Sequence, residues 1–182
     1  MSHTSISSRE HRTLEPLFTV AAFGGIICWV LLSVVGVLII NDGRFIYTLD
    51  DPYIHLAMSE GIHAGVYGIN NSEPAAAASS ILYPFLLSWA APYSFHQYLP
   101  FALNLAAFGA ILFVLRKILA EAGLDRTPQG RIFSTIVTVT VPLTLNLVGL
   151  LFMGMEHSIQ IALELSILLG LIRFLTKDRI DW

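Results

Sequence analysis

The chain has 182 residues, of which 55% are hydrophobic and 13% are charged, and its formal net charge is −3. A soluble domain carries about 25% charged residues, so this composition excludes an ordinary soluble domain and predicts an integral membrane protein. The single cysteine, Cys28, lies inside the first apolar run, which excludes an intrachain disulfide.

The first apolar run, Leu17–Ile40, follows a polar segment, residues 1–16. It is longer than the roughly 7–15 residues of a signal-peptide core, and it is long enough to cross a bilayer. No A-x-A-like cleavage site stands at its end, where the chain reads Asn41-Asp42-Gly43-Arg44. We therefore predict an uncleaved signal-anchor span preceded by a cytoplasmic tail, residues 1–16.

Three further runs are of spanning length. They are Leu99–Leu119, Ile132–Met153 and Ser158–Leu175. A fifth run, Ile81–Phe95, is shorter and is interrupted by two prolines. Whether this fifth run crosses the membrane decides the topology of everything that follows it.

Positive charge favours the arrangement in which Ile81–Phe95 does not cross, because cytoplasmic loops carry an excess of Lys and Arg. In that arrangement nine of the ten basic residues lie on the side of the N-terminus, and only Arg44 lies outside. If the run crosses, seven of those nine move outside. We therefore predict that Ile81–Phe95 is an interfacial or re-entrant helix on the outer side.

The predicted fold is all-α and polytopic, with about four transmembrane helices and with interfacial helices in a long first outer loop. The transmembrane module covers residues 17–176, its outer loop covers residues 41–98, and residues 177–182 form a cytoplasmic end. The outer loop is acidic. Its charged residues are Asp42, Asp50, Asp51, Glu60 and Glu73 against the single Arg44.

The most distinctive stretch of the outer loop is Asp50-Asp51-Pro52. Asp is favoured as an N-cap and Pro at the first helical position, which predicts a helix from Pro52 to about His63. Capping alone is one explanation for Asp51, and catalysis is the other, whereas Asp50 needs no capping role. A carboxylate here can act as a general base that takes the proton of an attacking acceptor. The predicted apolar stripe of the helix consists of Ile54, Ala57, Met58 and Ile62.

Polar residues near the acidic pair raise the question of a metal ion. His55 falls one helical turn after Asp51 and can share its face. No spacing here matches a known ligand signature, so we assign no metal and no other cofactor. The alternative is a divalent cation held by Asp50, Asp51, His55 and Glu73.

The second polar site is the turn Gly154-Met155-Glu156-His157-Ser158 between the last two runs. In one interpretation Glu156 stands at the start of a helix, where negative charge is favourable. In the other interpretation Glu156 and His157 face the same outer basin as Asp50. The sequence leaves both interpretations open.

These stretches resemble the N-terminal part of the GT-C superfamily of membrane glycosyltransferases, which includes the protein O-mannosyltransferases and the lipid A aminoarabinose transferases. The resemblance covers roughly residues 17–175. It is carried by Tyr47–Ala57, Tyr67–Asn70, Glu73-Pro74, Ser79–Pro84 and Gly154-Met155-Glu156.

The resemblance implies a polyprenyl-phosphate-linked sugar as donor, contact with membrane lipid and no nucleic-acid partner. It implies transfer on the periplasmic face of a bacterial inner membrane, with the N-terminus in the cytoplasm. Asp50 or Asp51 would be the catalytic base, with Asp50 the first choice, and Glu156 would line the same cavity. The expected substrate-binding residues are Tyr53, His55, Glu73, Glu156, His157 and Arg44.

The resemblance also concerns the extent of the protein. Family members have more spans than this chain, so we expect an N-terminal part of a longer enzyme that is inactive alone. The alternative hypothesis is a non-enzymatic membrane protein with several spans, such as an assembly or transporter component.

Overall fold

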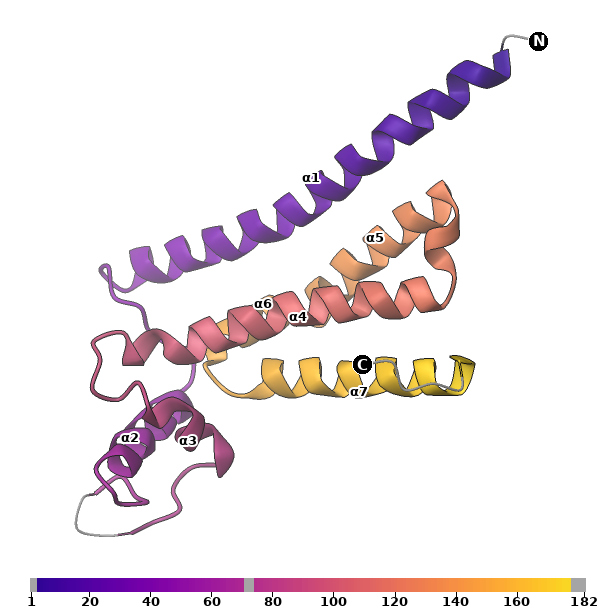
Figure 1. The fold of residues 1–182 in the computed structure, drawn as a ribbon. Helices are drawn as coiled ribbons and strands as arrows, with labels where there is room; N and C mark the ends of the chain where they lie inside the picture. The colour runs from indigo at the N-terminus through magenta and orange to yellow at the C-terminus, as the bar shows by residue number, and fades with distance from the viewer. Residues whose placement is uncertain (1–2, 71–73, 178–182) are drawn as a thin grey trace. The chain divides into compact units, whose positions relative to one another are not determined.

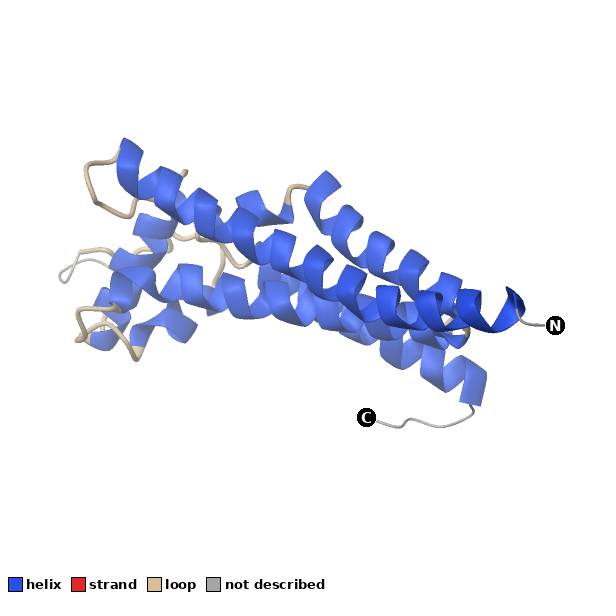
Figure 2. Ribbon diagram, turned by 90° about the horizontal axis from the view of Figure 1, so that it is seen from above, coloured by secondary structure: helices blue, strands red, loops and turns tan. Residues whose placement is uncertain are grey.

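The computed structural model describes residues 3–70 and 74–177, and every regular element within these ranges is a helix (Figure 2). The predicted all-α fold class is therefore confirmed for the described part of the chain. In chain order the elements are α1 (His3–Ile40), α2 (Asp51–His63), α3 (Leu82–Ser88), η1 (His96–Tyr98), α4 (Leu99–Glu121), η2 (Leu124–Arg126), α5 (Pro128–Thr144), α6 (Leu147–Met153) and α7 (His157–Lys177).

Three of the described helical segments are long and apolar enough to cross a membrane. They are Pro16–Ile40 in α1, His96–Glu121, which covers η1 and α4, and His157–Thr176 in α7. The bent pair of α5 and α6 is a fourth span if both helices count as one. By length and composition, the described residues are thus compatible with an integral membrane protein of three or four spans.

The third predicted span differs from the structure, because Ile132–Met153 is not one helix. α5 ends at Thr144, α6 begins at Leu147, and the two helices are bent by 45°. Asn146 has a φ of 53°, in the left-handed region that Asn tolerates better than most residues. A hydropathy pattern does not detect a bend that depends on the backbone conformation of one residue, so the sequence predicts one continuous run.

The N-terminal tail is helical and continuous with the first candidate span. α1 begins at His3 and continues without a break through Pro16 to Ile40. The helix therefore includes most of residues 1–16 as well as the first candidate span.

The short helix α3 occupies only part of the run Ile81–Phe95. It has 7 residues and rises by about 10 Å, since an α-helix advances 1.5 Å per residue. The hydrocarbon core of a bilayer is about 30 Å thick, so α3 alone is too short to cross it. The placement of this run at the outer interface stays a prediction.

The chain divides into two compact units, which we describe separately. The span unit consists of Met1–Phe45, Gly109–Val148 and Ala162–Trp182. The loop unit consists of Ile46–Phe108 and Gly149–Ile161.

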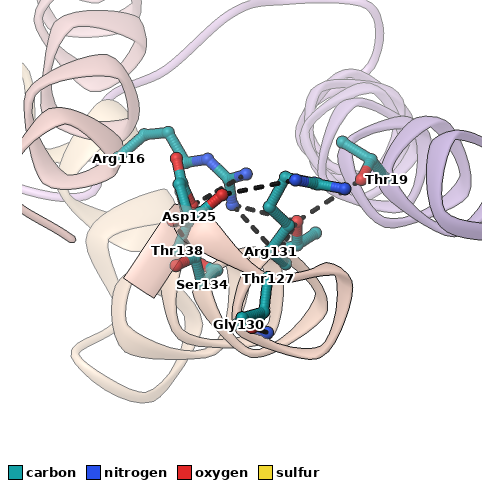
Figure 3. Close-up of polar contacts among 9 residues, drawn as sticks. Thr19, Arg116, Asp125, Thr127, Gly130, Arg131, Ser134 and Thr138 are labelled. Carbon is teal, nitrogen blue, oxygen red and sulfur yellow. Dashed lines mark hydrogen bonds and ion pairs between the residues drawn. The ribbon is translucent and has the colours of Figure 1, made fainter. Parts of the chain in front are cut away.

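Within the span unit, α1 packs against α5. Thr19 Oγ1 of α1 lies 3.4 Å from Thr135 Oγ1 of α5. Arg116 of α4 donates to the same Thr135 hydroxyl at 3.1 Å, and its Nη2 lies 3.3 Å from Asp125 Oδ1 (Figure 3). This cluster joins the C-terminal part of α4 to the N-terminal part of α5.

A second ion pair of the span unit joins α4 to α7. Arg173 Nε donates to Glu121 Oε1 at 2.9 Å. Glu121 at the end of α4 and Asp125 in η2 thus each have an Arg partner. The Arg residues that set the predicted topology therefore also hold helix ends together.

The topology predicts that cysteines placed at Ser72 and Gln129 react from opposite sides of the membrane. Each single-cysteine variant is made in a Cys28→Ser background and is labelled in intact cells with a membrane-impermeant maleimide. We expect labelling at Ser72 and none at Gln129 before the cells are opened. Labelling of both positions from one side would show that the run Ile81–Phe95 crosses the membrane.

Candidate functional site

The segment that precedes the acidic pair is fastened within the loop unit by buried Tyr47. Its hydroxyl donates to the carbonyl of Gln97 at 2.8 Å and accepts from the backbone N–H of Phe101 at 3.1 Å. Burial raises the pKa of Tyr47, so the phenol stays protonated and can serve both bonds. The chain is thus held against the start of α4 three residues before Asp50.

Thr48 fastens the same segment to the end of α6. Its backbone N–H and its hydroxyl both donate to the carbonyl of Phe152, at 3.0 and 3.2 Å. Tyr53 adds a third restraint, because its hydroxyl accepts from the N–H of Tyr47 at 3.0 Å. Tyr53 therefore orders the loop through its hydroxyl, while 44% of the residue remains exposed.

The start of α2 corrects the predicted cap. Asp50, not Asp51, occupies the N-cap position, and its carbonyl accepts from the N–H groups of Tyr53 at 2.9 Å and Ile54 at 3.4 Å. Asp51 is the first helical residue and Pro52 the second. Pro is tolerated there because the first turn of a helix has no internal partner for its N–H groups.

The carboxylates of Asp50 and Asp51 do not cap α2. The Asp50 side chain makes no cap hydrogen bond and is exposed. Within residues 3–70 and 74–177, neither Asp50 nor Asp51 takes part in a hydrogen bond or an ion pair through its carboxylate. Capping therefore does not account for Asp51, contrary to one of the two sequence-based explanations.

The buried face of α2 also differs from the predicted stripe. Of the predicted residues, only Met58 is buried, whereas Ile54, Ala57 and Ile62 are half-buried. The buried positions are Pro52, His55, Leu56, Met58, Ser59 and Gly61. Helical periodicity finds the helix but not this face, because two of its buried side chains are polar.

α2 packs side by side with α3 in the loop unit (Figure 1). The imidazole of His55 meets the ring of Tyr83 edge-on, with centroids 5.4 Å apart and an interplanar angle of 78°. Edge-to-face contacts of this kind are favoured between aromatic rings. This contact holds His55 between the two helices.

Gly154 brings the second polar turn against the start of α2. It has a φ of +67°, and a Cβ built on it would lie 2.6 Å from Tyr47 Cδ1 and 2.8 Å from Pro52 Cβ. Its carbonyl accepts from the Tyr83 hydroxyl at 3.3 Å. The turn that carries Glu156 therefore touches the helix that begins with Asp51.

Glu156 and Asp51 consequently act on the same buried histidine. His55 is 1% exposed, and burial lowers its pKa, while the charges of Glu156 and Asp51 oppose that shift. The imidazole is therefore neutral at pH 7. Its Nε2 lies 3.3 Å from Ser79 Oγ, and its buried Nδ1 has no hydrogen-bond partner among the described residues. The same holds for the buried Oε2 atom of Glu156.

The remaining predicted site residues are not all brought to this place. His157 is the half-buried first residue of α7, directly after Glu156. Arg44 is exposed and belongs to the span unit, whereas the acidic pair belongs to the loop unit. Glu73 lies outside the described residues.

The structure adds no metal centre to this picture. In the described ranges, no group of three His, Cys, Asp or Glu side chains is arranged to hold a metal ion. The alternative of a divalent cation held by Asp50, Asp51, His55 and Glu73 includes one residue, Glu73, that lies outside the described residues.

A second polar cluster, which the sequence does not indicate, joins α2 to η1. Ser59 Oγ lies 2.8 Å from His96 Nε2, and His96 Nδ1 lies 3.6 Å from Glu60 Oε1. The residue types match a Ser–His–acid relay, but the Ser59 hydroxyl donates to the carbonyl of Leu56 at 2.7 Å and is fully buried. A substrate cannot reach the buried Ser59 hydroxyl in this arrangement, so the cluster serves as a structural link between α2 and η1.

Comparison of the chain with models of known protein families, with curated proteins and with solved structures gave no match.

The contact at Gly154 predicts a large effect of Gly154→Ala on stability. A methyl group there meets Tyr47 and Pro52 and also strains a positive φ, so we expect a loss of about 3 kcal/mol. The matched control is Gly65→Ala. Gly65 has a φ of +87° with nothing within 4 Å of the added methyl group, so only the backbone cost of about 1–2 kcal/mol applies. The measurement is the free energy of unfolding in detergent, and equal losses would contradict the packing role.

Burial of neutral His55 predicts a pH dependence of the loop unit. The pKa of His55 is lowered from 6.5 in the folded state, so the unfolded chain takes up the proton first as the pH falls. The stability contributed by neutral His55 is therefore present above pH 6.5 and decreases below it. Amide hydrogen exchange of α2 should accelerate between pH 7.5 and pH 5, corrected for intrinsic exchange. His55→Gln should reduce this acceleration, and the control His63→Gln, at an exposed position of the same helix, should not.

Proposed function

We propose that this chain provides the acidic side of the active site of a membrane glycosyltransferase of the GT-C type. The donor is a sugar linked to a polyprenyl phosphate, and transfer takes place on the periplasmic face of a bacterial inner membrane. The single observation that carries this proposal is the exposed carboxylate of Asp50, which has no partner in the described part of the chain and lies in a segment that Tyr47 and Thr48 hold in place. A general base requires both properties, an accessible acceptor and a fixed position.

The chemistry assigned to Asp50 is proton transfer. As the hydroxyl or amine of the acceptor attacks the anomeric carbon, the bond from that carbon to the phosphate oxygen breaks. The electron pair of that bond leaves with the polyprenyl phosphate, and the proton of the acceptor passes to Asp50. Attack from the face opposite the phosphate inverts the configuration of the sugar.

Membrane placement supports this assignment. α4 and α7 enter the loop unit from candidate spans, so the acidic pair belongs to a compact unit that is attached to membrane-spanning helices. A lipid-linked donor is confined to the same membrane. The apolar spans account for the membrane partner, and the acidic pair accounts for the base.

One requirement of the donor is not met by the loop unit itself. Its sequence contains neither Lys nor Arg, although a phosphate normally binds to basic side chains or to backbone N–H groups. Arg44, two residues before the first residue of the unit, Ile46, is the nearest basic residue in sequence. We therefore assign the loop unit to the base and the acceptor, and we assign the phosphate contacts to residues outside it.

The test is Asp50→Asn in the full protein, with transfer from a labelled polyprenyl-phosphate sugar as readout. We expect kcat to fall by about 10²–10⁴-fold, the usual contribution of a positioned base, with membrane insertion unchanged. The matched control is Asp42→Asn, which removes an equal charge at a residue with φ 51°, a conformation that Asn accepts.

The outcomes of this test are distinct. Wild-type transfer by Asp50→Asn removes Asp50 as the base, and loss of transfer in Asp51→Asn alone would assign the role to Asp51. Equal losses in Asp50→Asn and Asp42→Asn would point to net charge rather than to a base.

A further inference from the structure

The loop unit combines negative charge with two buried polar atoms to which its described residues offer no hydrogen-bond partner. Its sequence contains five acidic residues and no Lys or Arg. Two of these acids, Glu156 and Asp51, act electrostatically on His55. The acidic residues are Asp50, Asp51, Glu60, Glu73 and Glu156. The span unit differs, because Asp125 and Glu121 there pair with Arg116 and Arg173.

The first unpartnered atom is Nδ1 of His55. The ring is 1% exposed, and its Nε2 faces Ser79 Oγ at 3.3 Å. The two nitrogens of an imidazole diverge, so Nδ1 points away from Ser79. The tautomer decides the roles of the two nitrogens: in the neutral Nε2–H form, Nε2 donates to the Ser79 hydroxyl and Nδ1 keeps a lone pair, and this is the form that the site requires.

The second such atom is Oε2 of Glu156, which is buried and has no hydrogen-bond partner within residues 3–70 and 74–177. Buried polar atoms in folded proteins are almost always hydrogen-bonded. In the Nε2–H tautomer of His55 both atoms are acceptors, and the described residues supply no hydrogen-bond donor to either of them.

Charge and geometry restrict the kind of donor. An anion is disfavoured, because the loop unit has no Lys or Arg to pair with it. A metal ion is disfavoured, because no three potential ligands are suitably arranged in the described residues. A primary ammonium group carries one positive charge and three diverging N–H donors, so it can donate to two separate acceptors at once.

We propose that His55 and Glu156, with Asp51 nearby, form a binding site for a primary ammonium group of a substrate. His55 Nδ1 and Glu156 Oε2 accept hydrogen bonds from the ammonium, and Asp51 contributes charge. The description of the ligand as a substrate rests on the proposed function, whereas cation binding itself does not. Asp50 is not part of this site and remains assigned to the chemistry.

The experiment uses the full chain in detergent micelles and ethylammonium chloride as the probe. Binding is followed by calorimetry and by NMR of protein labelled with ¹⁵N-histidine, in which His55 is assigned from the spectrum of His55→Gln. We expect an unprotonated His55 Nδ1 in the free protein and a shift of its resonance on titration. Tetramethylammonium, which has the same charge but no N–H donor, should bind about tenfold more weakly or worse.

The matched variants are Glu156→Gln and Glu60→Gln. Both remove one negative charge from the loop unit, but Glu60 contacts His96 instead of His55. Glu156→Gln should weaken ethylammonium binding by about tenfold or more, and Glu60→Gln should change it less than twofold. If Glu156→Gln loses helix content by circular dichroism, Asp51→Asn replaces it and should weaken binding by a smaller factor.

Four results would overturn the site. They are a hydrogen on Nδ1 of His55 in the free protein, equal effects of Glu156→Gln and Glu60→Gln, Mn²⁺ binding that depends on Glu156 and displaces ethylammonium, and no binding of ethylammonium at all. The last result would leave an ordered water as the partner of the two atoms. Each of them leaves the Asp50→Asn transfer assay unaffected, so failure of this site and failure of the proposed function are distinguishable.

Discussion

The architecture of the loop unit depends on one close contact, that of Gly154 with Tyr47 and Pro52. A residue with a Cβ does not fit there, since the added atom would lie within 2.8 Å of both neighbours. The contact joins a turn after α6 to the start of α2, about a hundred residues earlier in the chain. Tyr83 closes the arrangement by donating to the carbonyl of Gly154. Through this contact, Glu156 and Asp51 come to act on one histidine.

The two units differ in whether their acidic side chains have a basic partner. In the span unit, Asp125 and Glu121 each lie within 3.3 Å of an Arg side chain, and the pairs fasten helix ends. In the loop unit, Asp50 and Asp51 have no such partner in the described residues. The exposed Asp50 and the half-buried Asp51 are thus available to a ligand, which is why we connect this unit, and not the other, with ligand binding and chemistry.

Sequence reasoning located the long helices well. The predicted runs Leu17–Ile40, Leu99–Leu119 and Ser158–Leu175 end within three residues of the observed segments, because about twenty consecutive apolar residues leave few other possibilities. The helix α2 was also predicted, from the Pro after an acidic pair and the helical spacing that follows. The bend at Asn146 was not, since it depends on a single backbone conformation.

The candidate site was only partly accessible to the same reasoning. Asp50, Asp51 and Glu156 were selected as acids on one predicted side of the membrane, but the cap was placed one residue too late. The sequence did not predict the burial of His55 or the contact between Ser59 and His96. Helical periodicity assigns buried positions to apolar side chains, whereas these three side chains are polar.

By itself, the sequence determined that the chain is helical, that it contains long apolar segments and that its charge is unevenly distributed. These properties follow from composition and from the order of residues, which act locally. Only the tertiary structure decided which acids lack a partner among the described residues, which histidines are buried, and which glycine joins the two polar stretches. Those features depend on contacts between residues far apart in the chain, such as Gly154 with Tyr47, and no local pattern encodes them.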